Sequence, residues 1–512
     1  MRITRARYLS PALLLIAGGC GTAPGPNDAG GTACDGASSC QGEAPPESVC
    51  LERVAAGVLE DGCGVFVGGS FGGGDDANPG TRDKPLRTLQ RGVELARTGR
   101  GRVFACNDGF FEPLTLPSGV DLIGGFHCLN WQRFPAGRPL LQGRDENILL
   151  TVVPASADDT GAADGVSMIV HMGLQAHGPI TMLVQSNTVV EFIRSTIHSS
   201  SAWGGRDGEE WPWPYQAATG VDGVYGGDAC SAATVPGGAA AMRSCDDGLP
   251  SMGGKGGDGK PEDPERGDDG MPTPMPNPTN SGRGGSADRE NVGCSHGFNG
   301  APGDFGTLGA AGEGIGRISE AGWEGGRAGD GSRGMPGQGG GGGGGRRGGL
   351  AACGAVSKGG AGGGSGGAGG CGGRGGRGGE NGYPTIGIIA LHAKLTVRDS
   401  VIMTLEAGQG GDGGEPERGG KGGRGQLGGA VGDGTWSCRG GNGGLGGDGG
   451  YGGPGRGGDS IGIAYLDEDQ LTLENVTYEL GPPGKGGTSW DWSGTMVTGE
   501  DGIVVETLRF PE

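Results

Sequence analysis

The chain has 512 residues, of which 128 are glycine and 31 are proline, and its formal net charge is −20. Collagen also repeats every three residues, but it needs one glycine per triplet and abundant proline, so this composition excludes it. The excess of acidic residues makes nucleic acid and anionic lipid surfaces poor partners.

The first nineteen residues have the charge and hydropathy pattern of an export signal. Three arginines precede an apolar run over residues 8–16, which is too short to persist as a membrane-spanning helix. The Ala-Gly-Gly-Cys sequence that ends at Cys20 resembles a bacterial lipobox, in which the cysteine is lipidated and becomes the mature N-terminus. The resemblance implies a lipoprotein anchored through Cys20 to the outer membrane or cell surface. The alternative is an ordinary signal that is cleaved elsewhere.

Cysteine number and spacing favour disulfides. The chain has 13 cysteines, and assigning Cys20 to lipid leaves an even number, which suits an oxidising exterior. The connectivity stays open, and no cysteine pair has the spacing of a zinc site. The near-neighbour pairs are Cys34 with Cys40, Cys50 with Cys63, Cys106 with Cys128, and Cys230 with Cys245.

Residues 20–60 are rich in Gly, Pro and Ala in their first half and are predicted to form a flexible tether. From residue 61 to residue 200 the composition is ordinary, with short β-branched runs between turn residues, which predicts a series of short strands. The clear helical pattern is Pro85 to Thr98, with apolar residues on one face. A single amphipathic helix before short strands is typical of a cap on a solenoid.

A repeat survives the interruptions of the chain. Residues 190–197 align with residues 395–402 and then with residues 471–477. Strand alternation places two positions of each repeat inward and one outward, so stacked repeats would build a core that none could bury alone. The inward sets are Val190, Leu395, Leu471 and Phe192, Val397, Leu473, and the outward set is Glu191, Thr396, Thr472.

Three segments carry a family resemblance. Residues 75–81 contain Asn-Pro-Gly-Thr, residues 84–89 are Lys-Pro-Leu-Arg-Thr-Leu, and residues 118–126 are Ser-Gly-Val-Asp-Leu-Ile-Gly-Gly-Phe. This series resembles the start of pectin-lyase-like right-handed parallel β-helix proteins of uncharacterised function. The resemblance implies an all-β, right-handed parallel β-helix with one N-terminal capping helix. It implies no activity, because that fold hosts carbohydrate enzymes as well as binding and surface proteins.

Long glycine-rich inserts interrupt this coil. From Ser365 to Glu380 every third residue is not glycine, a period that matches a polyproline-II-type helix and puts those side chains on one ridge, built mainly for display. Because the inserts leave the coil at the same turn of successive repeats, we expect their segments to lie side by side and hydrogen-bond to one another. Disorder is the alternative. The inserts resemble PGRS-type glycine-rich surface repeats.

The sequence predicts the following organisation along the chain. The predicted segments are 1–19 signal, 20–60 lipidated tether, 61–200 N-terminal β-helix, 201–382 first insert, 383–406 rung, 407–458 second insert, 459–482 rung, 483–501 third insert and 502–512 terminal strand.

The candidate binding residues are aromatic. Trp203, Trp436, Trp490 and Trp492 lie in the inserts beside small or polar residues, where exposed rings can stack on sugars or anchor a protein partner. An equally weighted alternative is that these rings fill voids at the bases of the inserts.

Other candidates are weaker. Asp75, Asp76 and Asn78 form an oxygen-rich loop that could ligate calcium, although a plain Asx turn is the favoured interpretation. A polysaccharide lyase or glycoside hydrolase would need clustered carboxylates, and its candidates by repeat position are Glu191, Arg398, Asp399 and Glu474. We expect no cofactor and a non-enzymatic adhesion or surface-display scaffold that contacts polysaccharide or other cells. The alternative is a carbohydrate-active β-helix enzyme.

Overall fold

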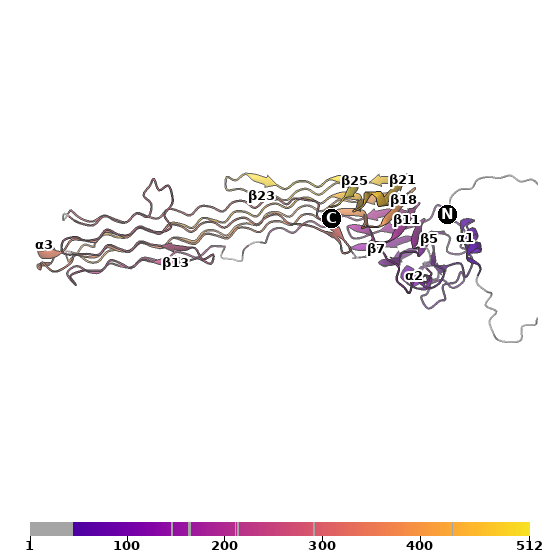
Figure 1. The fold of residues 1–512 in the computed structure, drawn as a ribbon, viewed down its shortest axis with the longest axis horizontal. Coiled ribbons are helices and arrows are strands. Elements are labelled where there is room, and N and C mark those ends of the chain that lie inside the picture. The colour runs from indigo at the N-terminus through magenta and orange to yellow at the C-terminus, as the bar shows by residue number, and fades with distance from the viewer. Residues whose placement is uncertain are drawn as a thin grey trace, which may run out of the picture.

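The computed structural model describes residues 45–144, 147–161, 165–209, 211, 215–289, 292–432 and 434–511. The predicted signal, the lipidation site Cys20 and the pair Cys34 and Cys40 lie outside these ranges. Figure 1 shows a wide body that contains most of the strands and a long rod that extends from it. Among the described residues, no helix combines the length and the apolar character needed to cross a bilayer.

The body is built from three parallel sheets, and the chain passes through them in turn. The first contains β1 (Val65–Val67), β2 (Arg102–Cys106), β5 (Asp121–Phe126), β8 (Val166–Val170), β11 (Val189–Ile193), β18 (Lys394–Arg398) and β21 (Leu471–Glu474). The second contains β4 (Leu114–Pro117), β7 (Ile148–Val153), β10 (Ile180–Val184), β17 (Thr385–Ala390), β20 (Ser460–Tyr465) and β25 (Val504–Arg509). The third contains β3 (Gly109–Phe111), β6 (Leu140–Gln142), β9 (Gly173–Gln175), β12 (Thr196–Ser199), β19 (Val401–Thr404) and β22 (Thr477–Glu479). The prediction of a mostly β chain with parallel strands is confirmed.

The register of the repeats is as predicted. Phe192 in β11 pairs with Val397 in β18, which pairs with Leu473 in β21. Phe192 and Val397 are fully buried, whereas Leu473 is 38% exposed. The last repeat is exposed because no further strand among the described residues covers it. Core burial thus comes from neighbouring repeats rather than from a repeat alone.

One turn of the coil repeats a backbone conformation that side chains rarely adopt. Arg194, Asp399 and Asn475 all have φ near +50° at this turn, and the residue after each of the first two is a buried serine. Ser195 N–H donates to Ser400 Oγ at 3.2 Å. Buried hydroxyls therefore link successive turns while the strained residues point outward.

The capping helix is shorter than its sequence pattern. Helix α2 spans Leu89–Arg97, and Thr88 caps it by accepting a hydrogen bond from Arg91 N–H at 3.3 Å. Leu86 instead bridges to Val67 as extended chain, because the cap fixes the start of the helix at Thr88. Burial of Leu89 and Val93 places the apolar face of α2 on the coil.

The predicted tether is wrong in its last part. Helix α1 spans Glu47–Ala55, inside the segment expected to be flexible. Val54 packs in a cluster with Phe66 and Trp131, and Cys50 is bonded to Cys63. Apolar burial and this crosslink hold the segment against the coil, an arrangement that composition alone does not reveal.

The rod consists of the glycine-rich inserts, whose extended segments run side by side (Figure 1). Backbone bonds recur every third residue, as when Gly205 N–H donates to Gln409 and Gly208 N–H donates to Asp412. Hydrogen bonds between neighbouring segments thus hold the described parts of the inserts in place, which argues against the disordered alternative. Hairpins and a short helix punctuate them: β13 (Met242–Ser244) with β14 (Pro250–Met252), β15 (Arg317–Ser319) with β16 (Gly322–Glu324), β23 (Thr488–Trp490) with β24 (Met496–Thr498), and α3 (Gly349–Cys353) at the far end. A 3₁₀ turn, η1 (Glu468–Gln470), precedes β21.

Residues 339–345, which are all glycine, show why the interior segments of the rod exclude side chains. All of these residues are buried, and three consecutive N–H groups bond to three different segments. The donors Gly340, Gly341 and Gly342 bond respectively to the carbonyls of Gly367, Phe298 and Asp268. A Cβ on Gly342 would lie 1.9 Å from the carbonyl oxygen of Lys255. The backbone is therefore packed on all sides, with no room for a side chain.

The ridge from Ser365 to Glu380 is only partly a display surface. Ser365, Ala368 and Cys371 are buried, whereas Arg374 is exposed. Ser365 Oγ accepts a hydrogen bond from Val224 N–H at 2.7 Å. The expectation of one outward ridge is corrected because the first half of the segment has neighbours on that side, which small residues accommodate.

Candidate functional site

Three disulfides brace the rod across segments that are far apart in sequence. They join Cys230 to Cys353, Cys245 to Cys371 and Cys294 to Cys438. The predicted near-neighbour pairing of Cys230 with Cys245 is therefore wrong, because each cysteine meets the segment that lies beside it. Two other near-neighbour pairs do form, Cys50–Cys63 and Cys106–Cys128.

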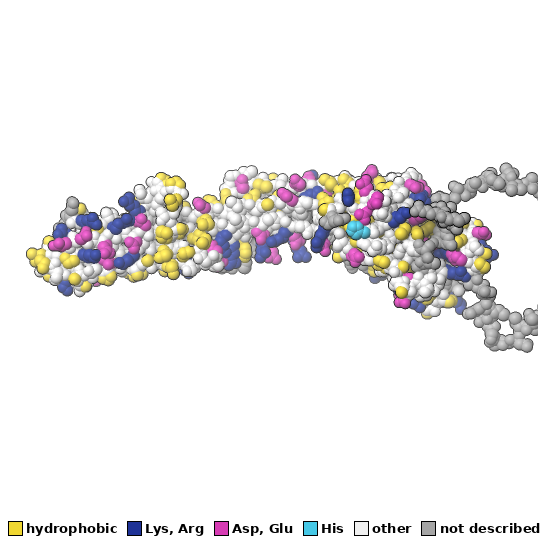
Figure 2. All heavy atoms as spheres, in the orientation of Figure 1, with side chains coloured by type: hydrophobic (Ala, Val, Ile, Leu, Met, Phe, Trp, Pro, Cys, Tyr) yellow, Lys and Arg dark blue, Asp and Glu magenta, His cyan; other side chains and the backbone are white. Residues whose placement is uncertain are grey.

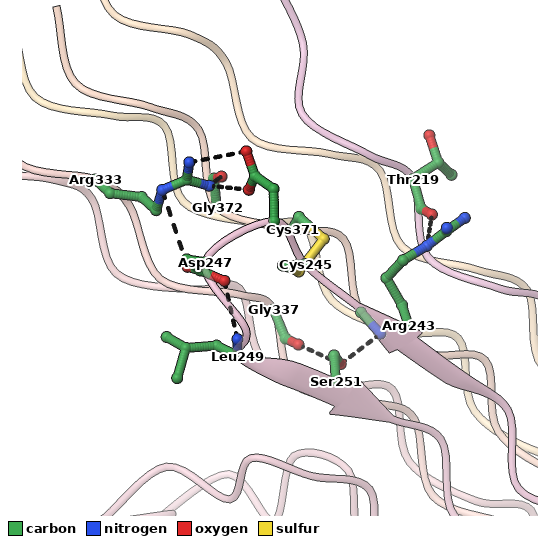
Figure 3. Close-up of a disulfide and its surroundings, with 12 residues drawn as sticks. Thr219, Arg243, Cys245, Asp247, Leu249, Ser251, Arg333, Gly337, Cys371 and Gly372 are labelled. Atoms are coloured by element: carbon green, nitrogen blue, oxygen red, sulfur yellow. Dashed lines mark hydrogen bonds and ion pairs between the residues drawn. A yellow bond between two sulfur atoms is a disulfide. The ribbon is translucent and has the colours of Figure 1, made fainter.

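Charged groups reinforce one of these crosslinks. Figure 3 shows the Cys245–Cys371 bond, with Arg333 reaching toward it and contacting Asp247. The adjacent Asp246 accepts hydrogen bonds from Arg333 and Arg374. Hydrogen bonds from Arg333, joined by those from Arg374, lower the pKa of Asp246 to about 2. These ion pairs sit on the surface, so they fix local geometry more than they add stability.

An aromatic cluster combines residues from all three inserts. Trp492 stacks on Phe305 with ring centroids 4.8 Å apart and lies 5.4 Å from Tyr451. The indole N–H of Trp492 donates to Gly306 O at 2.9 Å, which fixes the ring. Phe305 is 60% exposed and Trp490, on the same hairpin as Trp492, is 48% exposed. The cluster presents rigid apolar faces to solvent on an otherwise polar rod.

The other predicted tryptophans lie elsewhere. Trp203 packs edge-on against Tyr383 at 5.9 Å, and Tyr383 also contacts Trp323 at 5.2 Å. Trp203 is still 49% exposed, so at this position one ring both packs at the base of the rod and faces solvent. Trp436 is exposed elsewhere on the rod and itself forms an isolated antiparallel bridge with Ala430. The structure therefore brings Trp490 and Trp492 close in one hairpin but does not unite the four.

A polar groove of about 440 Å³ lies next to Trp203 where the first and second inserts leave the coil. Its lining includes Asp207, Glu406 and Asp412 together with glycine backbone. Asp207 Oδ1 accepts from Asp412 N–H at 2.8 Å, and Asp412 Oδ1 accepts from Thr488 N–H at 2.6 Å. The carboxylates of Asp207 and Asp412 thus join segments of different inserts through hydrogen bonds.

The side chains of the loop proposed for calcium form hydrogen bonds with backbone groups of the loop and of the residues that precede α2. Asp75 Oδ1 accepts from Ala77 N–H at 3.0 Å, which is the favoured Asx turn. Asp76 accepts from the backbone of Arg87 and Thr88, and Asn78 Nδ2 donates to Pro85 O. These contacts build the entry to α2. Across the part of the chain that the structure describes, no group of three or more His, Cys, Asp or Glu residues is arranged to hold a metal ion.

Two of the carboxylates proposed for an enzyme, Asp399 and Glu474, lie in surface pairs. Arg398 Nε lies 2.7 Å from Glu474 Oε2, and Asp399 accepts from Asn475 Nδ2 at 2.9 Å. Glu191 is on a strand position opposite Thr396. The register thus places no second carboxylate directly beside Glu191, and the paired groups lie at or next to the turn.

Sequence reasoning missed Phe305 and Tyr451. Tyr451 is the single non-glycine residue of its triplet, and Phe305 shares a Gly-Asp-Phe triplet with Asp304, a signal that is visible in the sequence. Which triplets become neighbours depends on the lateral order of the segments, which the sequence does not state.

Figure 2 shows Lys, Arg, Asp and Glu side chains interspersed along the visible face of the rod, with hydrophobic groups between them. The visible surface of the rod therefore offers both apolar faces and charged groups. The chain matches no protein-family model, no curated protein sequence and no solved structure.

Proposed function

We propose that the chain is a surface adhesin or display scaffold without catalytic activity. Its body is a right-handed parallel β-helix and its rod is a polyglycine-II-like bundle. The protein is exported, anchored through Cys20 to the outer membrane or cell surface, and contacts polysaccharide or the surfaces of other cells through the rod.

The observation that carries this proposal is the aromatic cluster of Phe305, Tyr451 and Trp492. Each ring comes from a different insert, and the supporting segments are joined by backbone bonds, as when Gly306 N–H donates to Asp448. Apolar rings held in place on a polar support lose little conformational entropy when a sugar ring stacks on them. The paired state of Arg398 and Glu474 supports a binding role over the enzymatic alternative.

A glycan-binding measurement tests this proposal. In the Trp492→Ala variant, and in the Phe305→Ala variant, we expect binding of the folded protein to immobilised cell-surface polysaccharides to weaken at least about tenfold, because the stacking face is removed. The matched control is Phe71→Ala, which removes a 91% exposed ring from the body. Equal binding by all three variants, or release of reducing ends or unsaturated sugars from the polysaccharide, would contradict the proposal.

A further inference from the structure

A second groove, of about 450 Å³, lies on the first insert and differs in charge from the rest of the acidic protein. Its lining contains three arginines, two serines and one aromatic ring. These residues are Arg266, Arg283, Arg289, Ser286, Ser295 and Phe298.

The walls of this groove are fixed. Ser286 N–H donates to Ser295 Oγ at 2.7 Å, and Ser295 N–H donates back to Ser286 O at 3.0 Å. Phe298 N–H donates to Arg283 O at 2.9 Å, and the neighbouring Cys294 is bonded to Cys438. The groove is therefore preorganised, so a ligand would not have to order it.

The arginines are spaced for an extended ligand. Arg283, Ser286 and Arg289 recur every three residues, which in a polyproline-II-type segment puts them on one ridge with about 9 Å between successive members. A small ion would reach one of these side chains. A linear polymer with regularly spaced anionic groups would reach several.

The acidic residues beside Arg266 and Arg289 leave guanidinium N–H donors available to a ligand. Arg266 is paired with Asp269, and Arg289 Nε lies 3.3 Å from Asp263 Oδ1. Both arginine side chains remain more than half exposed. A guanidinium has five N–H donors, so one carboxylate partner orients the group without exhausting it. Phe298, 48% exposed, adds a ring face beside these charges.

From these features we propose that the groove binds an anionic polysaccharide, with Arg283 and Arg289 holding its sulfate or carboxylate groups and Phe298 contacting a sugar ring. This inference rests on the proposed adhesive function and names the ligand class of a separate site on the rod. Phe298 is the only aromatic ring among the described lining residues of the groove, whereas proteins that bind single-stranded nucleic acid stack successive bases on several aromatic rings.

The test uses the full-length folded protein and four soluble probes: dextran sulfate, alginate, unmodified dextran and single-stranded DNA. We expect binding of dextran sulfate, alginate or both, no binding of dextran, and weaker binding as salt rises. Binding of the sulfated polymer alone, or of alginate alone, supports the proposal and identifies the anionic group. Preference for DNA would overturn it.

The key variant is Arg283→Ala with Arg289→Ala, which we expect to weaken anionic binding at least about tenfold. Its control is Arg206→Ala with Arg317→Ala, which removes the same charge from side chains that are 88% and 73% exposed elsewhere. Equal losses of affinity in both double variants would show that binding depends on the net charge of the protein and not on this groove, and would overturn the proposal. Intact anionic binding in the groove variant, together with loss in the Trp492→Ala variant, would refute this groove and leave the proposed function standing. Absence of all glycan binding would refute both.

Discussion

The three-sheet body and the glycine-rich rod both stack extended segments side by side, but different parts of each residue hold them together. In the body, side chains such as Phe192 and Val397 fill a core between sheets, and hydrogen bonds run along the stack. In the rod, residues such as Gly342 bond laterally through the backbone and leave no core of side chains. The stability of the body therefore depends on the volume of its buried side chains, whereas the stability of the rod depends on the absence of side chains between its segments.

The difference predicts opposite tolerance to substitution. Removing side-chain atoms should damage the body, because a buried cavity loses packing. Adding a single carbon should damage the rod, because neighbouring carbonyls already occupy that space. Three experiments test this contrast between the body and the rod.

The largest effect is expected in the body. Phe192→Ala should lower the free energy of unfolding by about 4 kcal/mol, since Phe192 is fully buried among neighbouring repeats. The control is Leu473→Ala at the equivalent position of the last repeat, where 38% exposure limits the loss to about 1 kcal/mol. Urea denaturation measures both. Equal losses would show that the repeats do not share one core.

A smaller effect is expected in the rod. Gly342→Ala should destabilise it by about 2–3 kcal/mol, because the new Cβ would meet the Lys255 carbonyl at 1.9 Å. In Gly204→Ala the nearest atom would be Gln409 O at 3.5 Å, an ordinary contact, so this control should be close to neutral. Hydrogen exchange of residues 339–345 reports the change. Unaltered protection in Gly342→Ala would contradict the close backbone packing.

The smallest effect depends on pH and concerns the body alone. Burial, together with the positive charges of Arg133, Arg194 and Arg138, lowers the pKa of His171 to about 4. The unfolded chain binds this proton near pH 6.5, so stability is complete above that value and declines as the pH falls from 6.5 to 4. After allowance for partial exposure the loss is roughly 1–2 kcal/mol.

His171→Asn should flatten this part of the stability profile, because asparagine tolerates the φ of +54° but does not titrate. His177→Asn, at an exposed position, should leave the profile unchanged. Thermal unfolding between pH 4 and pH 7 distinguishes the two. An unchanged slope in the His171→Asn protein would assign the titration to another group.

The sequence predicts the body better than the rod for a physical reason. Alternation of apolar residues is a local pattern, so the pairing of Val190 with Leu395 follows from aligned segments. The start of α2 depends on one capping side chain, Thr88, within a longer apolar pattern. Helix α1 is stabilised by tertiary contacts and a disulfide, which its position after a Gly- and Pro-rich stretch conceals.

In the rod, the period of three predicts which residues share a ridge but not what lies beside that ridge. The burial of Ser365, the Cys245–Cys371 bond and the meeting of Phe305 with Trp492 all depend on the lateral order of segments. Glycine carries no side-chain pattern that specifies this order. Residue type in the sequence therefore predicts Trp490 and Trp492 as candidate binding residues but does not identify Phe305 and Tyr451 as their neighbours.

The lateral bonding of the inserts also bears on how such a protein can change length. A segment with three residues per turn keeps the same residues facing the same neighbours when whole triplets are added or removed, whereas one extra residue rotates all later positions by about a third of a turn. The bonds from Gly205 and Gly208 to Gln409 and Asp412 advance by three on both segments. Matched triplet insertions in adjoining segments would therefore lengthen the rod without disturbing the body. The length of the rod can thus change in steps of three residues during evolution.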